Sequence, residues 1–300
     1  MLKYLENNTW GYVKNDEVLV QAKTWFYPQM PKGHSLCKVG LIGEFKCLEK
    51  ASLEESKALF DKLFDELKKL GATKIVGPMD GNTWQSYRLT TYYGDQTTFT
   101  MEPFTPKHFI EHWVNAGFIP EETYSSYITS INEWEDKRVD KLHARFAGLT
   151  FRPLQQEDLS AIFDLSLQSF TRNPYYIPID KEVYLNKYGN MMSMLKPNVS
   201  TVVYDGYELV GYLFAMMDMN INANGDPTNR VILKTVAVKE ERKYAGLGTY
   251  LLSNLVTTMK TMGVSSAIHA LMYDKNAVQN IIKDNSQKLR QYTLYKRDFL

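Results

Sequence analysis

Residues 231–238 read VILKTVAV, residues 239–248 read KEERKYAGLG, and residues 249–262 read TYLLSNLVTTMKTM. The first segment is rich in β-branched residues and predicts a strand. The third has apolar residues at helical spacing and predicts an amphipathic helix over Gly248–Met262. Between them, Gly246 and Gly248 allow a tight turn and let a ligand approach the backbone closely. The pattern is a strand, a glycine-containing loop and a helix.

A helix that follows such a loop offers an anion site, because its first N–H groups have no intrahelical partner and its dipole is positive there. A pyrophosphate suits this kind of site. The loop is not a P-loop, because no Gly-Lys-Ser/Thr follows the glycines. It is not a dinucleotide fingerprint either, because Leu251 stands where the third glycine is required. A plain tight turn before a helix is the alternative interpretation.

The residues around this segment predict alternating strands and helices from residue 149 onward, in the order β-α-α-β-β-β-α-β-α-β. Two prolines interrupt any regular pattern over residues 171–178, and Asp180 is a candidate N-cap. The expected strands are 149–152, 201–204, 209–219, 231–238, 266–272 and 292–295, and the expected helices are 155–168, 180–195, 248–262 and 276–284.

The first part of the chain repeats some of this order but lacks the initial β-α-α unit. Glycine stops both the helix predicted before Gly71 and the helix predicted before Gly263, and a strand follows each. We therefore predict two related halves, although a chance likeness between two ordinary α/β segments also fits. The expected elements are a hairpin at 12–19, strands at 38–47, 74–76 and 123–131, and helices at 53–70 and 105–116, with the charged stretch 133–145 as a solvated connection.

The loop and the element order together resemble one known family. Lys243-x-x-Gly246-x-Gly248 is similar to (Arg/Gln)-x-x-Gly-x-(Gly/Ala), the acyl-CoA signature of the GNAT superfamily of N-acyltransferases, with Lys in place of the usual Arg or Gln. The first half resembles the degenerate GNAT-like halves of some bacterial members. The resemblance implies an α/β (α+β) protein of two GNAT-like mixed-sheet domains, a truncated one at 1–145 and a complete catalytic one at 146–300.

The resemblance further implies that acetyl-CoA, or another acyl-CoA, is the co-substrate. It would lie in a V-shaped opening between the strand ending at Val238 and the strand starting near Ser266. The backbone of Val236, Ala237 and Val238 would pair with the pantetheine arm, and the diphosphate would be held by the backbone N–H groups of Lys243, Tyr244, Ala245, Gly246, Leu247 and Gly248. The equivalent loop of the first half, residues 48–53, has no glycine and carries an acid, so we expect no diphosphate there.

The family often places Asn after the next strand and, seven residues later, a Tyr that protonates the leaving thiolate. Asn276 fits the first position, although it is equally an N-cap of the predicted short helix, and Lys283 stands at the second. His269, which lies within a predicted strand, is also typical of a buried core residue. Candidate acids, by proximity in the sequence, are Tyr273, Tyr292 and Tyr295, and candidate bases are Asp218, His269 and Asp274.

The composition bounds the class of protein. Hydrophobic residues make up 44% of the 300 residues and charged residues 23%, as in globular proteins. A net charge of +1 gives no support for a nucleic-acid partner. Cys37 and Cys47 match no disulfide framework or metal spacing, so we predict no metal site. Residues 209–217 are too short a run for a membrane helix, which needs ~20 residues, and no signal-peptide core is present. We expect a cytoplasmic protein with no membrane partner.

We therefore expect an N-acetyltransferase that moves an acetyl or another short acyl group from CoA to a primary amine of a small-molecule or peptide acceptor. Two alternatives stay open: a non-catalytic acyl-CoA-binding or sensing protein, which Lys283 favours, and an aminoacyl- or long-acyl-transferase. The sequence does not determine the oligomeric state. Candidates for the acceptor pocket, or for packing between the halves, are the loop residues Trp84, Tyr87, Tyr92, Tyr93, Tyr175 and Tyr176.

Overall fold

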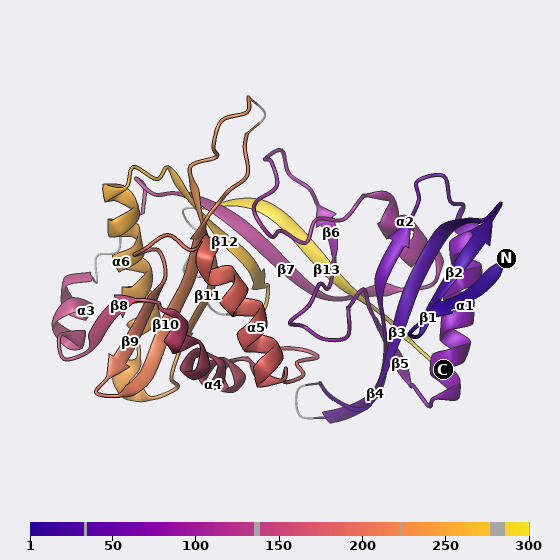
Figure 1. The fold of residues 1–300 in the computed structure, drawn as a ribbon, viewed down its shortest axis with the longest axis horizontal. Coiled ribbons are helices and arrows are strands. Elements are labelled where there is room, and N and C mark those ends of the chain that lie inside the picture. Colours follow the sequence, from indigo (N-terminus) through magenta and orange to yellow (C-terminus); the bar gives the residue numbers. More distant parts are fainter. Residues whose placement is uncertain (33–34, 135–138, 223, 277–285, 300) are drawn as a thin grey trace.

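The computed structural model describes residues 1–32, 35–134, 139–222, 224–276 and 286–299. Its strands form one continuous sheet with parallel and antiparallel pairs, and helices pack against that sheet (Figure 1). This architecture confirms the mixed α/β (α+β) class expected from the sequence.

The first half is an antiparallel meander followed by a helix and by a strand that runs parallel to the last strand of the meander. Its elements are β1 (Leu2–Glu6), β2 (Thr9–Lys14), β3 (Glu17–Lys32), β4 (Ser35–Cys47), α1 (Leu53–Lys69), β5 (Lys74–Gly77), β6 (Leu89–Tyr92), α2 (His108–Asn115) and β7 (Ile119–Ser130). The helix expected over 53–70 is confirmed as α1. Both cysteines lie in β4 as free thiols.

The sequence does not predict β1 or the full length of β3. Pro28 lies within β3, and proline is normally a strand breaker because it cannot donate to the ladder. The structure accommodates it at a register shift between Tyr27 and Met30. A bulge therefore lets β3 continue where the residue pattern suggests an end.

The second half follows the predicted order closely. Gly206, at φ +61°, makes the predicted hairpin turn between β9 and β10. Of the helix predicted over 276–284, only Asn276 belongs to the described residues, and Lys283 lies outside them. The elements are α3 (Val139–Phe146), β8 (Thr150–Pro153), η1 (Gln156–Asp158), α4 (Leu159–Phe170), α5 (Lys181–Met191), η2 (Met192–Met194), β9 (Thr201–Asp205), β10 (Glu208–Met217), β11 (Arg230–Val238), η3 (Arg242–Tyr244), α6 (Leu247–Thr261), β12 (Ser266–Tyr273) and β13 (Gln287–Asp298).

The two halves exchange their last strands. β7 of the first half pairs with β12 of the second, and β13, the last strand of the chain, pairs with β5 and β7 of the first. Figure 1 shows β7 and β13 crossing side by side, with both chain termini beside the first half. The sheet order is β1-β2-β3-β4-β5-β13-β7-β12-β11-β10-β9-β8, and β6 adds to β13.

This exchange bears on the expected division of the chain. Gln287–Asp298 belongs to 146–300 by sequence, but its neighbours in the sheet are strands of the first half. A cut between residues 145 and 146 therefore does not separate two sheets. The division into related halves at 1–145 and 146–300 stays a prediction.

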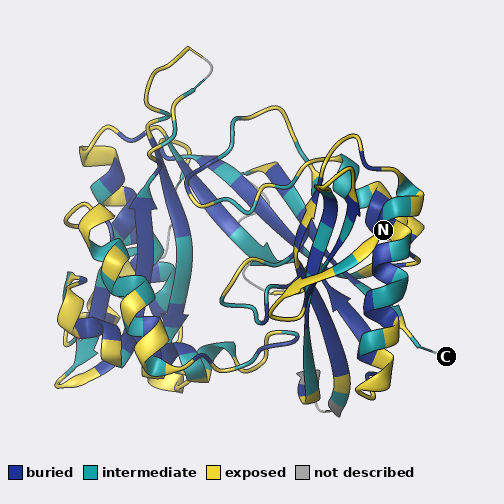
Figure 2. Cartoon of the chain, turned by 45° about the vertical axis from the view of Figure 1, so that its right-hand side comes forward, coloured by how far each residue is buried: buried dark blue, intermediate teal, exposed yellow. Residues whose placement is uncertain are grey.

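Helices cover both faces of the sheet in the second half. α6 buries Leu251 and Leu255 against one face, and α4 buries Ile162 and Phe163 against the other. Figure 2 shows the strands mostly buried and the outer helix surfaces exposed. Successive residues of β10 point alternately to the α6 side and to the α4 side of the sheet. The end of β11 pairs with β10 and therefore also lies between the two helix layers. No described helix is long and apolar enough to cross a membrane.

Candidate functional site

The two central parallel strands of the second half separate part of the way along. β11 and β12 pair from Arg230↔Ser266 to Leu233↔His269 and not beyond. At that point Lys234 is an extra residue in β11, because Thr235 faces Phe214 and Leu233 faces Ala215 in β10. β12 has its own register shift between His269 and Met272. Each bulge bends its strand, and the carboxyl ends of the two strands splay apart.

A cleft of about 660 Å³ occupies the opening between these strand ends. Residues 233–238 of β11 form one wall and residues 269–273 of β12 form another. Helices α4 and α5 and the loop between them close one side. The first half contributes residues 83–88, together with Tyr124 of β7. The V-shaped opening expected between these strands is therefore present, and both halves of the chain line it.

The backbone of Val236, Ala237 and Val238 borders this cleft. Pairing with Gly211, Tyr212 and Leu213 of β10 satisfies one edge of these residues. Within the described part of the chain no strand pairs with the other edge, because the ladder to β12 stops at Leu233. An extended ligand with amide groups can bind such an edge as an added strand.

The helix that follows β11 begins at an uncapped end. Gly246 is its N-cap, with φ +93° and no side chain to accept a hydrogen bond. Among the described residues, no backbone carbonyl accepts from the N–H groups of Leu247, Gly248 and Thr249, and the helical ladder starts with Tyr250 donating to Gly246. The predicted loop residues therefore present free donors at the positive end of α6.

The side chains of this loop make contacts of their own. Lys243 Nζ lies 3.0 Å from an Asp205 carboxylate oxygen, and Tyr244 donates a hydrogen bond to the same oxygen. Arg145 donates to the carbonyls of Arg242 and Lys243. These contacts fix the turn and leave the backbone as the part of the loop that can hold an anion.

The equivalent loop of the first half is built differently. Ser52 caps α1: its hydroxyl accepts from the Glu55 N–H, and the Glu55 carboxylate accepts from the Ser52 N–H. The neighbouring backbone of β4 is also bonded within the chain, since Met79 donates to Ile42 and Asp80 accepts from Glu44. A carboxylate of the chain itself thus occupies the helix end where a phosphate would bind.

Tyr273 and Asn276 both line the cleft, as the sequence predicts. The Tyr273 hydroxyl donates to a carboxylate oxygen of Glu122 at 2.8 Å, and Lys275 also binds that oxygen. Burial raises the pKa of Tyr273, and the negative charge of Glu122 raises it further. The hydroxyl therefore keeps its proton at neutral pH.

His269 also lines the cleft, but its ring is a packed core group. It stacks on Trp134 with 5.2 Å between ring centroids and an interplanar angle of 22°. Burial lowers the pKa of His269 to about 4, and its Nε2 has no hydrogen-bond partner in the described part of the chain. An imidazole with so low a pKa is a weak proton acceptor for an ammonium group.

The structure does not bring Asp218 to the cleft. Asp218 lies where β11 begins, at the closed end of the β11–β12 pair, and forms a buried ion pair with Arg230 at 2.6 Å. It also accepts hydrogen bonds from Thr100 and Thr228. Both oxygens of the carboxylate accept from structural donors, which disfavours a base at this position, and the catalytic role of Asp218 stays a prediction.

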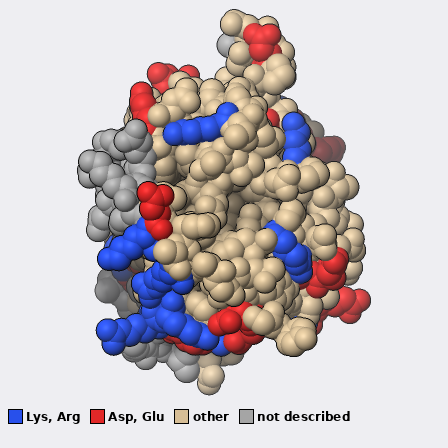
Figure 3. All heavy atoms as spheres, turned by 90° about the vertical axis from the view of Figure 1, so that its left-hand side faces the viewer, with Lys and Arg blue, Asp and Glu red and all other residues tan. Residues whose placement is uncertain are grey.

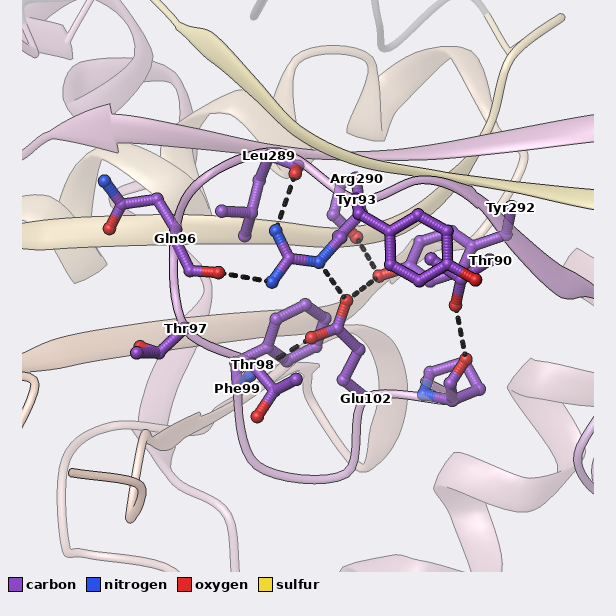
Figure 4. A network of polar contacts seen from close by, with 12 residues as sticks. Thr90, Tyr93, Gln96, Thr97, Thr98, Phe99, Glu102, Leu289, Arg290 and Tyr292 are labelled. Carbon is purple, nitrogen blue, oxygen red and sulfur yellow. Dashed lines mark hydrogen bonds and ion pairs between the residues drawn. The ribbon is translucent and has the colours of Figure 1, made fainter. Parts of the chain in front are cut away.

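The remaining candidates lie away from the reacting end of the cleft. Tyr292 is fully buried and donates to Glu102, which is ion-paired with Arg290 (Figure 4). Tyr295 belongs to the core of the first half around α1. Asp274 accepts from Gln291 of β13. These residues hold β13 and the loop 96–105 in place, and none of the three lines the cleft.

Other side chains that line the cleft are missed by sequence analysis. Trp84, Tyr87 and Tyr176 are among the expected aromatic candidates and do line it, whereas Tyr92, Tyr93 and Tyr175 do not. The missed residues include three cations and one tyrosine: Arg88, Lys187, Lys234 and Tyr124. No local motif marks them, because strands and loops distant in the sequence bring them together.

Figure 3 shows a second-half face of the molecule with a hollow near its centre and side chains of both charges around it. The face carries no uniform basic field. Basic side chains gather at the lower left of this view, and acidic side chains lie beside them and on the right.

Comparison with known proteins connects these features to a family. A family profile described as an acetyltransferase (GNAT) domain matches residues 150–272, which run from the start of β8 almost to the end of β12. No curated protein matches the sequence. The matched region contains the split strands, the uncapped helix and the loop between them.

Solved structures resemble the whole chain at low sequence identity. A probable N-acyltransferase from Enterococcus faecalis V583 has a TM-score of 0.61 at 12% identity, over 97% of this chain and 61% of that one. A GCN5-related glucosamine N-acetyltransferase region in a fungal multi-domain GH3 β-N-acetylglucosaminidase has 0.56 at 11%, over 96% and 33%. A tandem GNAT protein from the clavulanic acid biosynthesis pathway has 0.51 at 12%, over 97% and 82%. The chain thus spans a third of one relative and under two thirds of another, and these likenesses show the fold alone.

Proposed function

Because residues 150–272 of this chain form a GNAT acetyltransferase domain, we propose that the protein transfers an acetyl or short acyl group from CoA to a primary amine. One observation carries the proposal: a bare strand edge and an uncapped helix N-terminus belong to the same strand–loop–helix unit. The edge at Val236–Val238 suits the amides of a pantetheine arm, and the N–H groups after Gly246 suit a diphosphate.

The order of these features along β11 sets the direction of the ligand. The diphosphate position lies at Lys243–Gly248, the pantetheine position at Val236–Val238, and the acyl end near Lys234, where the strands begin to part. An amine that enters the cleft attacks the thioester carbon there. The C–N bond forms, the C–S bond breaks, the amine nitrogen gives up one proton, and the thiolate takes up one proton. Holding both reactants in this geometry supplies much of the rate.

Tyr273 is the proton donor that the proposal favours. It lies on the β12 wall of the cleft, opposite β11, and its raised pKa keeps the hydroxyl protonated. Asn276 follows on the same wall and is proposed to contact the co-substrate. General acid catalysis of this kind contributes about 10²- to 10⁴-fold.

Tyr273→Phe is expected to lower kcat by at least about tenfold and to leave the Kd of acetyl-CoA unchanged, since only the transferred proton is lost. The measurement is initial rate by thiol release, together with calorimetric titration of acetyl-CoA. Tyr292→Phe is the control, because Tyr292 is a rival candidate that lies outside the cleft. Equal kcat for Tyr273→Phe and the wild type would exclude Tyr273 as the acid.

The first half is proposed as a structural partner that walls the acceptor side of the cleft. Its loop over residues 83–88 lines the cleft, and its own helix end is capped by Ser52 and Glu55. Calorimetry with acetyl-CoA is therefore expected to give one site per chain. Two sites would contradict this role. No binding to the folded protein would refute the proposed function, and binding without turnover on any amine would indicate a sensing protein.

A further inference from the structure

Arg88 is a buried cation that lines the cleft. Its relative exposure is 5%, and its guanidinium carbon lies 3.9 Å and 4.0 Å from the ring centroids of Tyr87 and Tyr124. Nε donates to the Tyr87 carbonyl, but Nη1 is buried and has no hydrogen-bond partner among the described residues. No described carboxylate forms an ion pair with it. A buried polar group without a partner costs free energy unless a ligand completes it.

Lys234 is a second cation in the same cleft. It occupies the bulge of β11, and its Nζ donates to the Met101 carbonyl at 3.2 Å. Burial, and after it the positive charge of Arg88, lower the pKa of Lys234 to about 8, against an opposing effect of Glu102. Both cations line the same cleft, Lys234 from β11 and Arg88 from the loop of the first half.

The cleft lacks a matching negative charge. Its lining contains Arg88, Lys187 and Lys234, and the one acidic residue among the described lining residues is Glu240. Glu240 is largely exposed and is ion-paired with Arg172. Two buried carboxylates outside the lining are already bound: Glu102 by Arg290 and Tyr292 (Figure 4), and Glu122 by Tyr273 and Lys275.

Arg88 and Lys234 lie at the other end of the proposed co-substrate site from its diphosphate. Lys234 precedes the pantetheine edge at Val236–Val238, whereas the diphosphate donors follow it at Gly246–Thr249. A negative charge beside Lys234 and Arg88 therefore belongs to the acceptor. A guanidinium edge held between two rings matches the planar fork of a carboxylate.

We propose that the acceptor is an amine that also carries a carboxylate, and that Arg88 and Lys234 bind this carboxylate. The proposal rests on the proposed function, since it places the group relative to the acyl end of the cleft. In this proposal the first half of the chain takes part in substrate recognition directly, because Arg88 belongs to it.

The test uses product-like probes and needs no turnover. Saturation-transfer NMR compares a mixture of N-acetyl amino acids with a mixture of the corresponding N-acetyl amino acid amides, each with CoA-saturated protein. The wild type is expected to bind the best acid at least about tenfold more tightly than its amide. Arg88→Gln and Lys234→Gln are each expected to reduce this preference to within about threefold, as loss of a charge-assisted hydrogen bond requires.

Arg172→Gln is the matched control, because it removes one positive charge beside the cleft from an exposed residue. It is expected to keep the preference for acids. Equal binding of acids and amides, no binding of any acid, or a preference that both cleft variants retain would overturn the proposal. So would a fall in kcat for Lys234→Gln without any change in acid binding, which indicates an oxyanion contact. Acetyl-CoA titration of the same proteins before CoA is added reports failure of the proposed function separately.

Discussion

Gly246→Asp is expected to weaken acetyl-CoA binding about 100-fold, which corresponds to roughly 2.8 kcal/mol. The new carboxylate stands at the N-cap of α6 and competes with the diphosphate for the N–H groups of Leu247 and Gly248. It also repels the diphosphate. A Cβ at this position lies 3.0 Å from Leu142 Cδ2, so the loop has little room to turn the carboxylate away.

Gly246→Asn distinguishes the effect of the added charge on acetyl-CoA binding from the effect of backbone strain at residue 246. Residue 246 has φ +93°, a region that favours glycine and that Asn tolerates better than most residues. The Asn variant is expected to bind acetyl-CoA within about tenfold of the wild type, since it adds the same bulk without a charge. Calorimetry on both variants, with circular dichroism to verify folding, makes the measurement. An Asp variant that folds and binds like the wild type would mean that the loop is only a turn.

Asp218→Ala is expected to lower the free energy of unfolding by about 3–5 kcal/mol, because Arg230 then remains buried without a counter-ion. The same substitution releases Thr100 and thereby the loop that carries Met101 into the cleft wall. Urea unfolding measures the loss. Thr228→Val is the reference variant, because it removes a single hydrogen bond to Asp218. Its free energy of unfolding is expected to fall by about 1 kcal/mol.

The same pair gives a pH dependence. Burial raises the pKa of Asp218, but hydrogen bonds from Thr100 and the Arg230 guanidinium outweigh it and hold the pKa below its usual value. The stabilisation is therefore complete above the unfolded pKa of about 3.9 and is lost as the pH falls through the folded pKa. The stability difference between wild type and Asp218→Ala is expected to shrink below about pH 4.

The Asp218→Ala result also decides between stability and catalysis. The folded fraction of the variant is expected to turn over within about threefold of the wild-type rate, since residue 218 lies outside the cleft. If turnover instead fell by about two orders of magnitude while unfolding stayed unchanged, Asp218 would have the catalytic role that its place in the sequence suggested.

The strand–loop–helix unit is recognisable in the sequence because its features are local. Gly246 and Gly248 interrupt a strong strand and a strong amphipathic helix within a few residues, so short-range patterns describe the whole unit. The same locality explains why Tyr273, which directly ends the next strand, lines the cleft, whereas its catalytic role stays a prediction. Asp218 and Tyr292 do not line the cleft, because nearness in sequence does not report which end of a strand faces it.

By itself the sequence determined the strand–loop–helix unit, the helix faces and the mixed class of the fold, because backbone propensity and apolar period act over a few residues. Only the tertiary structure decided the rest. The exchange of β7 and β13 joins the two halves in one sheet, and Arg88 and Lys234, which are 146 positions apart in the sequence, line the same cleft. Such contacts depend on sheet pairing between distant segments, whose register the packing of the whole sheet selects.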